Sequence, residues 1–224
     1  MLNFQAPYFH RKTNRVVFQM TNATPMIDWF HENFPVATVL LLRHPIPNAL
    51  SIMQAGWRQE CADFLNHRWF VEVQLTGEQV DFARRVVERG SLLAQHVLDW
   101  SLKMLIPLRA LRSERYPEWL TITYEQLVLQ PEELLQVLSR RLDLPDGAAM
   151  RDQLLRPSRT VSSETEGKIK DQDYLLRRWR KQINPAEEKE LMKIPKMFGL
   201  DVYEPGRLIA ADPYLAKDVP RPRL

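Results

Sequence analysis

The chain is poor in cysteine, and it has no long hydrophobic run. Its one cysteine, Cys61, cannot form an internal disulfide, which excludes a small disulfide-stapled secreted fold and favours a reducing compartment. The longest purely apolar stretch is far too short to cross a bilayer, and the first residues lack the basic start and apolar core of a signal peptide. With Met1 as the native start, we expect a cytoplasmic protein with no membrane partner.

A strong net charge is also lacking. The chain has 31 Lys and Arg against 28 Asp and Glu, a formal charge of +3, and the basic residues are scattered rather than gathered in one block. This pattern does not require a nucleic-acid partner. With 45% hydrophobic residues over 224 positions, the chain can bury the core of one large domain.

Glycine is scarce as well, and proline marks the boundaries between elements instead, with 16 Pro against 7 Gly. A continuous apolar run such as 37–42 is typical of a strand covered on both faces, which favours a parallel sheet. Polar residues over 156–171 predict a surface loop, and a proline-rich tail begins at Glu204. In the first half of the chain the pattern predicts a helix capped by Thr24 and running to Phe34, a strand over 37–42, and a helical region over 76–116 with Thr76 as cap and a kink or break at Pro107. In the second half it predicts a strand over 119–124, a helix over 130–142, and two short helices over 173–182 and 185–197.

The segment LLLRHPIPNALS, residues 40–51, is the most informative motif. It combines the end of a predicted strand, an arginine and a proline-marked helix start, which together favour an anion site. Arg43 would supply a planar, permanently charged fork for a dianion, and Ser51 would add a hydroxyl from the following helix. His44 is a further candidate donor, although a histidine in a turn more often makes local hydrogen bonds.

Together with other features, this segment resembles the sulfotransferase family, whose members take a sulfuryl group from 3′-phosphoadenosine 5′-phosphosulfate (PAPS). The resemblance is closest to the bacterial type and covers roughly residues 16–203. It rests on RHPIPNALS, on the ITYEQL stretch with Pro131 after it, and on Trp179 ahead of Phe198-Gly199-Leu200.

The resemblance implies a fold and a set of site residues. The fold would be α/β, a three-layer P-loop-like sulfotransferase fold with a parallel sheet, helix-rich and shortened at the N-terminus, over residues 1–203 with a tail over 204–224. Arg43 and Ser51 would hold the 3′-phosphate of the nucleotide, and Tyr124 would lie against the adenine. The polar stretch Ser162–Lys168 would return to the 3′-phosphate. PAPS would be the co-substrate, with no metal.

One feature of the family has no match here. Its members open with a phosphosulfate loop of the type PKSGTT, whereas no glycine occurs between Met1 and Asn22. The resemblance places that loop upstream of residue 1, and a family lysine falls near Gln19. The catalytic residues and the general base are therefore unknown. A sheet shortened in this way needs cover from the residues up to Phe18 or from a partner, and we expect marginal stability or self-association without it.

Three functions remain open from the sequence. The first is a PAPS-dependent transferase acting on a hydroxyl or amine of an unidentified small-molecule or carbohydrate acceptor, with His67 or His96 as candidate bases. The second is a catalytically inactive relative that binds nucleotide or serves as a partner subunit. The third is a helical interaction domain that uses the basic face over 177–181, which otherwise is an ordinary solvated surface.

Overall fold

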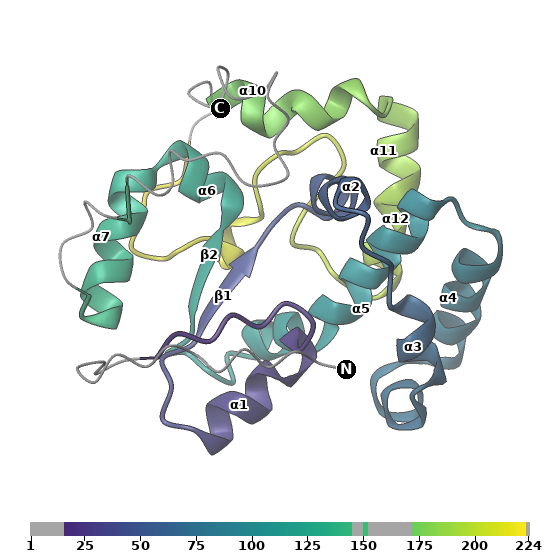
Figure 1. The fold of residues 1–224 in the computed structure, drawn as a ribbon, viewed down its shortest axis with the longest axis horizontal. Helices are drawn as coiled ribbons and strands as arrows, with labels where there is room; N and C mark the ends of the chain where they lie inside the picture. Colours follow the sequence, from purple (N-terminus) through teal and green to yellow (C-terminus); the bar gives the residue numbers. More distant parts are fainter. Residues whose placement is uncertain (1–15, 145–149, 152–171, 223–224) are drawn as a thin grey trace.

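The computed structural model describes residues 16–144, 150–151 and 172–222, and helices dominate it (Figure 1). No helix in these described ranges combines the length and apolar character that a membrane span requires. The architecture is helix-rich α/β. Its elements are η1 (Thr24–Met26), α1 (Ile27–Asn33), β1 (Val39–Leu42), α2 (Pro45–Gln54), α3 (Cys61–Asn66), η2 (Phe70–Gln74), α4 (Gly77–Arg89), α5 (Leu92–Arg112), β2 (Leu120–Thr123), α6 (Tyr124–Leu129), α7 (Pro131–Leu142), α10 (Gln172–Arg177), η3 (Arg178–Lys181), α11 (Pro185–Leu191), α12 (Lys193–Met197) and η4 (Asp212–Tyr214).

A two-stranded parallel sheet lies at the centre. β1 pairs with β2 in a register that places Leu42 opposite Thr123, and each strand leads directly into a helix, α2 after β1 and α6 after β2. The parallel pairing confirms the prediction from the apolar run. Its burial on both faces is wrong, because Leu40 and Leu42 lie in the core whereas Leu41 remains 51% exposed.

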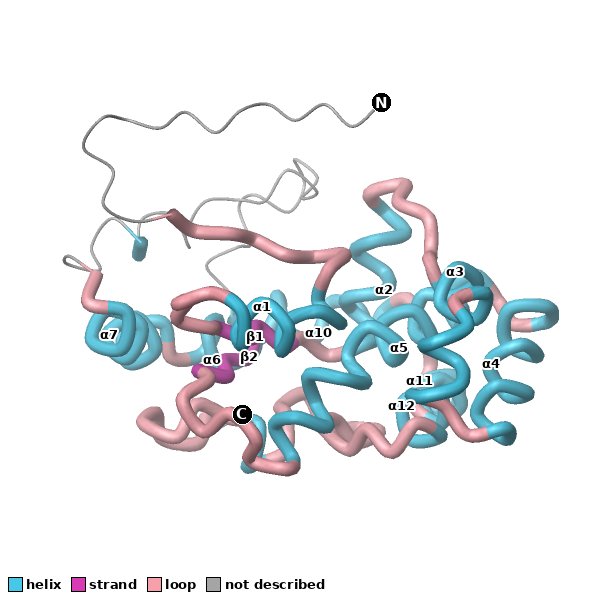
Figure 2. Tube along the Cα trace, turned by 90° about the horizontal axis from the view of Figure 1, so that it is seen from below, coloured by secondary structure: helices cyan, strands magenta, loops and turns pink. Residues whose placement is uncertain are grey.

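The core forms between the sheet, α2 and α5. α2 packs along α5, whose buried side chains include Val97, Leu98, Leu102 and Leu105. Figure 2 shows the two strands between the N-terminal segment on one side and the C-terminal segment on the other. The C-terminal segment wraps over the rest of the chain, where Leu208, Tyr214 and Val219 are buried.

One predicted helix break is misplaced for a local reason. The region over 76–116 divides at Gly90 and Ser91, not at Pro107, which lies inside α5. Ser91 caps α5 by accepting the Ala94 amide at 3.2 Å, and a Cβ at Gly90 would lie 2.5 Å from the Val86 carbonyl oxygen. The predicted loop over 156–171 lies outside the described residues.

Thr24, predicted to cap the first helix, makes a different contact. Its hydroxyl donates to the carbonyl oxygens of Met20 and Thr21 at 3.2 and 3.0 Å, and Ala23 occupies the cap position. Because Thr24 is the first residue of this short helix and alanine at the cap position has no acceptor, the helix begins without a side-chain cap.

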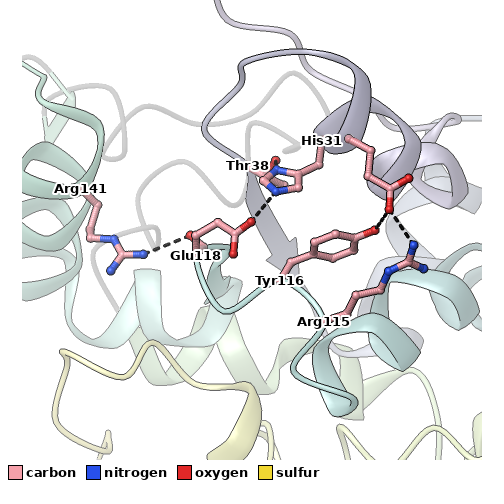
Figure 3. A network of polar contacts seen from close by, with 7 residues as sticks. His31, Thr38, Arg115, Tyr116, Glu118 and Arg141 are labelled. Carbon is pink, nitrogen blue, oxygen red and sulfur yellow. Dashed lines mark hydrogen bonds and ion pairs between the residues drawn. The ribbon is translucent and has the colours of Figure 1, made fainter.

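A polar network ties α1 to the turn before β2 (Figure 3). The two ring nitrogens of His31 lie 3.1 Å from Thr38 Oγ1 and 2.5 Å from Glu118 Oε1, and the Tyr116 hydroxyl donates to Glu32 at 2.5 Å. These contacts hold the amino-terminal ends of both strands. The opposite, carboxyl-terminal ends therefore remain as the place where a ligand site can form.

Thr76→Ala tests the best-defined cap of the fold. Thr76 Oγ1 accepts the Gln79 amide while the Gln79 side chain accepts the Thr76 amide, at 3.3 and 3.0 Å. Losing this capping box should lower the free energy of unfolding by about 1 kcal/mol, measured by urea denaturation. Thr76→Ser keeps the acceptor and should retain most of the stability; equal losses in both variants would contradict a capping role.

Candidate anion-binding site

Arg43 and Tyr124 meet where the two parallel strands end. Each follows the last residue of its strand, and the Arg43 guanidinium lies over the Tyr124 ring at 4.5 Å from its centroid. Neighbouring parallel strands expose their carboxyl ends at one sheet edge, so this meeting follows directly from the topology. A cation over the face of a phenol ring is held electrostatically and keeps its donors free for a ligand.

Arg43 has little internal compensation for its charge. It forms no ion pair with any residue in the described ranges, and its Nε is buried without a hydrogen-bond partner. Burial lowers the pKa of Arg43 from its ordinary value, the nearby Tyr124 and Glu125 oppose this, and the charge of Arg178 lowers it further. A guanidinium remains charged even so. Two arginines near one another therefore face a deficit of negative charge.

Arg178 was not singled out by the sequence, which predicted a solvated basic face over 177–181. In the structure Arg180 pairs with the buried Glu188 at 3.3 Å and Arg177 pairs with Asp173, whereas Trp179 is buried. Arg178 is partly buried and forms no ion pair within the described ranges. It is the member of this basic run that lies near Arg43, although like Ser51 it does not line the groove described below, and only the three-dimensional fold reveals this proximity.

The start of α2 cannot bind an anion through its backbone. Pro45 and Pro47 have no amide hydrogens, the Ile46 amide donates to His44 Nδ1 at 3.3 Å, and the His44 amide donates to Glu125 Oε1 at 3.0 Å. All donors that a helix start normally offers are therefore absent or used. An anion here must therefore be bound by side chains.

Glu125 accepts hydrogen bonds from two distant parts of the chain. One oxygen accepts the His44 amide, the other accepts the Tyr203 hydroxyl at 2.7 Å, and the residue is 3% exposed. Burial raises the pKa of Glu125, while these two hydrogen bonds and the charge of Arg43 act to lower it. The same burial, with the neighbouring Glu125 charge, raises the pKa of Tyr203 well above its ordinary value.

A groove with a volume of about 1410 Å³ opens beside this site. Its wall includes Arg43, Tyr124 and, from α2, Asn48 and Ile52. Ser51 is partly buried on α2 and does not line the groove. Residues four apart share one face of a helix, so Asn48 and Ile52 face the groove together and Ser51 lies at the flank of that face.

The three histidines that the sequence offered as candidate site residues differ in their burial and contacts. His44 is buried and stacks on Trp179 with 5.1 Å between ring centroids, His96 is buried on α5, and His67 is exposed and accepts the Phe70 amide. None of the three lines the groove. Burial, more than any charge, lowers the pKa of His96. The stretch Ser162–Lys168 lies outside the described residues.

No protein-family model, curated protein or solved structure matches this chain. The site therefore has to be interpreted from its own chemistry: two neighbouring arginines, an aromatic ring and a groove at the carboxyl ends of parallel strands.

His44 gives the site a pH signature. Burial, with the charges of Arg180 and Arg43, lowers the pKa of His44 from 6.5 to about 3. As the pH falls below 6.5 the unfolded chain binds a proton that the folded chain does not, so the free energy of unfolding falls, by at most about 1.4 kcal/mol per pH unit from this group.

His44→Asn should reduce this loss, because an asparagine oxygen can accept the Ile46 amide but does not titrate. Urea denaturation at about pH 7 and about pH 5 should show a smaller loss in the variant than in the wild type. The same loss in both proteins would show that His44 is not held neutral.

Proposed function

We propose that this chain binds the 3′-phosphate of PAPS, or of its product adenosine 3′,5′-bisphosphate, through Arg43 and Arg178, as a sulfotransferase-type protein. The observation that carries the proposal is Arg43 at the strand ends, with a buried and unpartnered Nε, with Arg178 near it and with the buried carboxylate of Glu125 beside it. A phosphate monoester carries nearly two negative charges at neutral pH and accepts bidentate hydrogen bonds from guanidinium groups.

Tyr124 supports a nucleotide rather than a free phosphate. Its ring lines the groove next to Arg43, so the base of a nucleotide whose phosphate contacts Arg43 has an aromatic surface within reach. The guanidinium lies over one face of the ring, so the adenine would stack on the opposite face or pack against the ring edge. This is the stacking role that the sulfotransferase resemblance implies for Tyr124.

The transfer reaction is the wider form of the proposal. An acceptor hydroxyl or amine would attack the sulfur of PAPS in line, and hydrogen-bond donors would stabilise charge on the sulfonate and the departing bridging oxygen. Binding without turnover is the second candidate, because no segment of the 224-residue sequence matches a phosphosulfate loop. A sulfate-transfer assay separates the two once binding is established.

Titration with adenosine 3′,5′-bisphosphate tests the half-site. We expect the ligand to raise the melting temperature and to bind more tightly than adenosine 5′-monophosphate, which lacks the 3′-phosphate. At 100 times the dissociation constant the ligand should add about 2.7 kcal/mol of stability. No stabilisation of the wild type, or equal binding of both nucleotides, would overturn the assignment of Arg43 to a 3′-phosphate.

Arg43→Gln and Arg178→Gln should each weaken this binding by about tenfold or more, as the loss of a hydrogen bond to a charged group does. Arg140→Gln is the matched control, because Arg140 is exposed on α7 and pairs with Asp218 at 3.2 Å, away from the groove. Calorimetry measures the three dissociation constants. A loss in Arg140→Gln as large as in Arg43→Gln would indicate nonspecific charge attraction.

Asn48→Ala and Ser51→Ala separate the contact that the structure favours from the one that the resemblance implies. Asn48 lines the groove beside Arg43, whereas Ser51 does not. We therefore expect Asn48→Ala to weaken nucleotide binding by about fivefold, the value of one neutral hydrogen bond, and Ser51→Ala to change it less. The opposite order would show that α2 rotates or shifts when nucleotide binds.

A further inference from the structure

A second polar cluster lines the groove where α5 meets the segment before α3. Lys103 Nζ lies 2.8 Å from Asp99 Oδ2 and 3.1 Å from Glu60 Oε2, and Asp99 Oδ1 accepts the Glu60 amide at 2.9 Å. All three residues line the same groove as Arg43. The anion site uses none of them, so their role at the groove needs its own explanation.

Part of this cluster is structural. Asp99 is 2% exposed, and by accepting the Glu60 amide it fixes the residue that precedes α3 against α5. Burial acts to lower the pKa of Lys103, but hydrogen bonds and charge from Asp99 and Glu60 outweigh it, so the net shift is upward and the ammonium stays protonated. The cluster therefore keeps two carboxylates around one cation.

Hydrogen-bonding capacity remains at the groove surface. The ammonium of Lys103 has three hydrogens and two carboxylate partners, and the side chain is 14% exposed. The Glu60 carboxylate contacts Lys103 through Oε2 and is 28% exposed, so its other oxygen can accept a hydrogen bond from a molecule in the groove. One donor and one acceptor thus lie side by side, which is the complement of a hydroxyl group.

Two tryptophans of the groove wall bear on the kind of molecule that the groove can bind. Trp57 is 63% exposed and offers an open aromatic face, and Trp100, 4% exposed, has a buried indole N–H with no partner in the described ranges. An aromatic face covers the apolar side of a ring. The Trp100 N–H is buried below the groove surface, so the open face of Trp57 and the polar Glu60–Lys103 pair are the features that favour a ring that is apolar on its face and polar at its rim.

We propose that this wall of the groove binds a neutral hydroxylated ring of the pyranoside type, with one hydroxyl donating to Glu60 and accepting from Lys103, and with the ring face on Trp57. A hydroxyl both donates and accepts, whereas an ammonium group can only donate to Glu60 and a carboxylate can only accept from Lys103, so neither charged group satisfies both side chains. The inference goes beyond the anion site and does not rest on it, since the two sites share the groove but no side chain.

Titration of the ¹⁵N-labelled protein with cellobiose tests the inference through its tryptophan indole signals. We expect shifts of the Trp57 and Trp100 signals that saturate at millimolar concentrations. Cyclohexylammonium and cyclohexanecarboxylate, which have similar rings but one charge each, should shift them little. Saturating shifts with either charged ring and none with cellobiose would overturn the proposal, as would no shift with any of the three.

Substitutions in the groove wall test where cellobiose binds. Trp57→Ala and Glu60→Gln should each weaken cellobiose binding by about tenfold, because one loses the aromatic face and the other a charged acceptor. Trp69→Ala is the matched control, since Trp69 is 51% exposed but does not line the groove. An equal loss of cellobiose affinity in Trp69→Ala, or no loss of affinity in Trp57→Ala, would refute the site. The Trp57→Ala result decides the question even if Glu60→Gln destabilises the fold.

Arg43→Gln separates this inference from the nucleotide proposal. It should leave the cellobiose titration unchanged while weakening adenosine 3′,5′-bisphosphate. Cellobiose binding that disappears in Arg43→Gln would show that the sugar occupies the anion site, which contradicts a separate hydroxyl site. Failure of nucleotide binding with intact cellobiose binding would remove the first proposal alone.

Discussion

The buried carboxylate of Glu125 is the interaction on which the rest of the site depends. It joins the start of α2, through the His44 amide, to the C-terminal segment, through the Tyr203 hydroxyl. Each partner would otherwise be a buried polar group without a hydrogen bond, at a cost of about 1–3 kcal/mol for each. Its charge also lies beside Arg43 and offsets part of the cost of burying that guanidinium.

The charge around Glu125 does not balance within the described residues. Arg180 is matched by the buried Glu188, which also accepts the Gly206 amide at 2.7 Å and so ties the C-terminal segment to α11. After that pairing, Arg43 and Arg178 lie near one another without an ion pair in the described ranges, and Glu125 is the buried carboxylate beside Arg43. A buried excess of positive charge destabilises a folded chain unless a ligand supplies the opposite charge, which is why such imbalances mark binding sites more often than structural ones.

The sequence could predict the parts of this arrangement that depend on local order. Arg43 and Tyr124 meet because both follow strands of a parallel pair. An apolar run followed by a charged residue signals the end of the first strand, whereas the second is predicted to include Tyr124 and ends at Thr123. Arg178, Glu125 and Tyr203 carry no such signal. Their proximity depends on how η3, α6 and the C-terminal segment pack, and Arg178 within its basic run looks like an ordinary solvated residue.

The rotation of α2 about its own axis and the exposure of each face of β1 cannot be predicted for a related reason. The spacing of polar residues on α2 does not reveal which of Asn48 and Ser51 faces the groove, because packing against α5 sets the rotation of the helix. The apolar run of β1 likewise cannot show that one face stays open at Leu41, since a buried and an exposed leucine have the same letter in the sequence.

The closed start of α2 determines what kind of anion the site can select. A glycine-rich loop binds a chain of phosphates through several backbone amides, but here Pro45, Pro47 and the His44 cap remove those donors. The dipole of α2 still contributes about 0.3–1 kcal/mol toward an anion near its start. Directional bonds must come from guanidinium groups, which match one terminal phosphate or sulfate better than a polyphosphate chain. Selectivity at this site therefore depends on charge and shape at a single tetrahedral group, with the neighbouring Tyr124 ring distinguishing what that group is attached to.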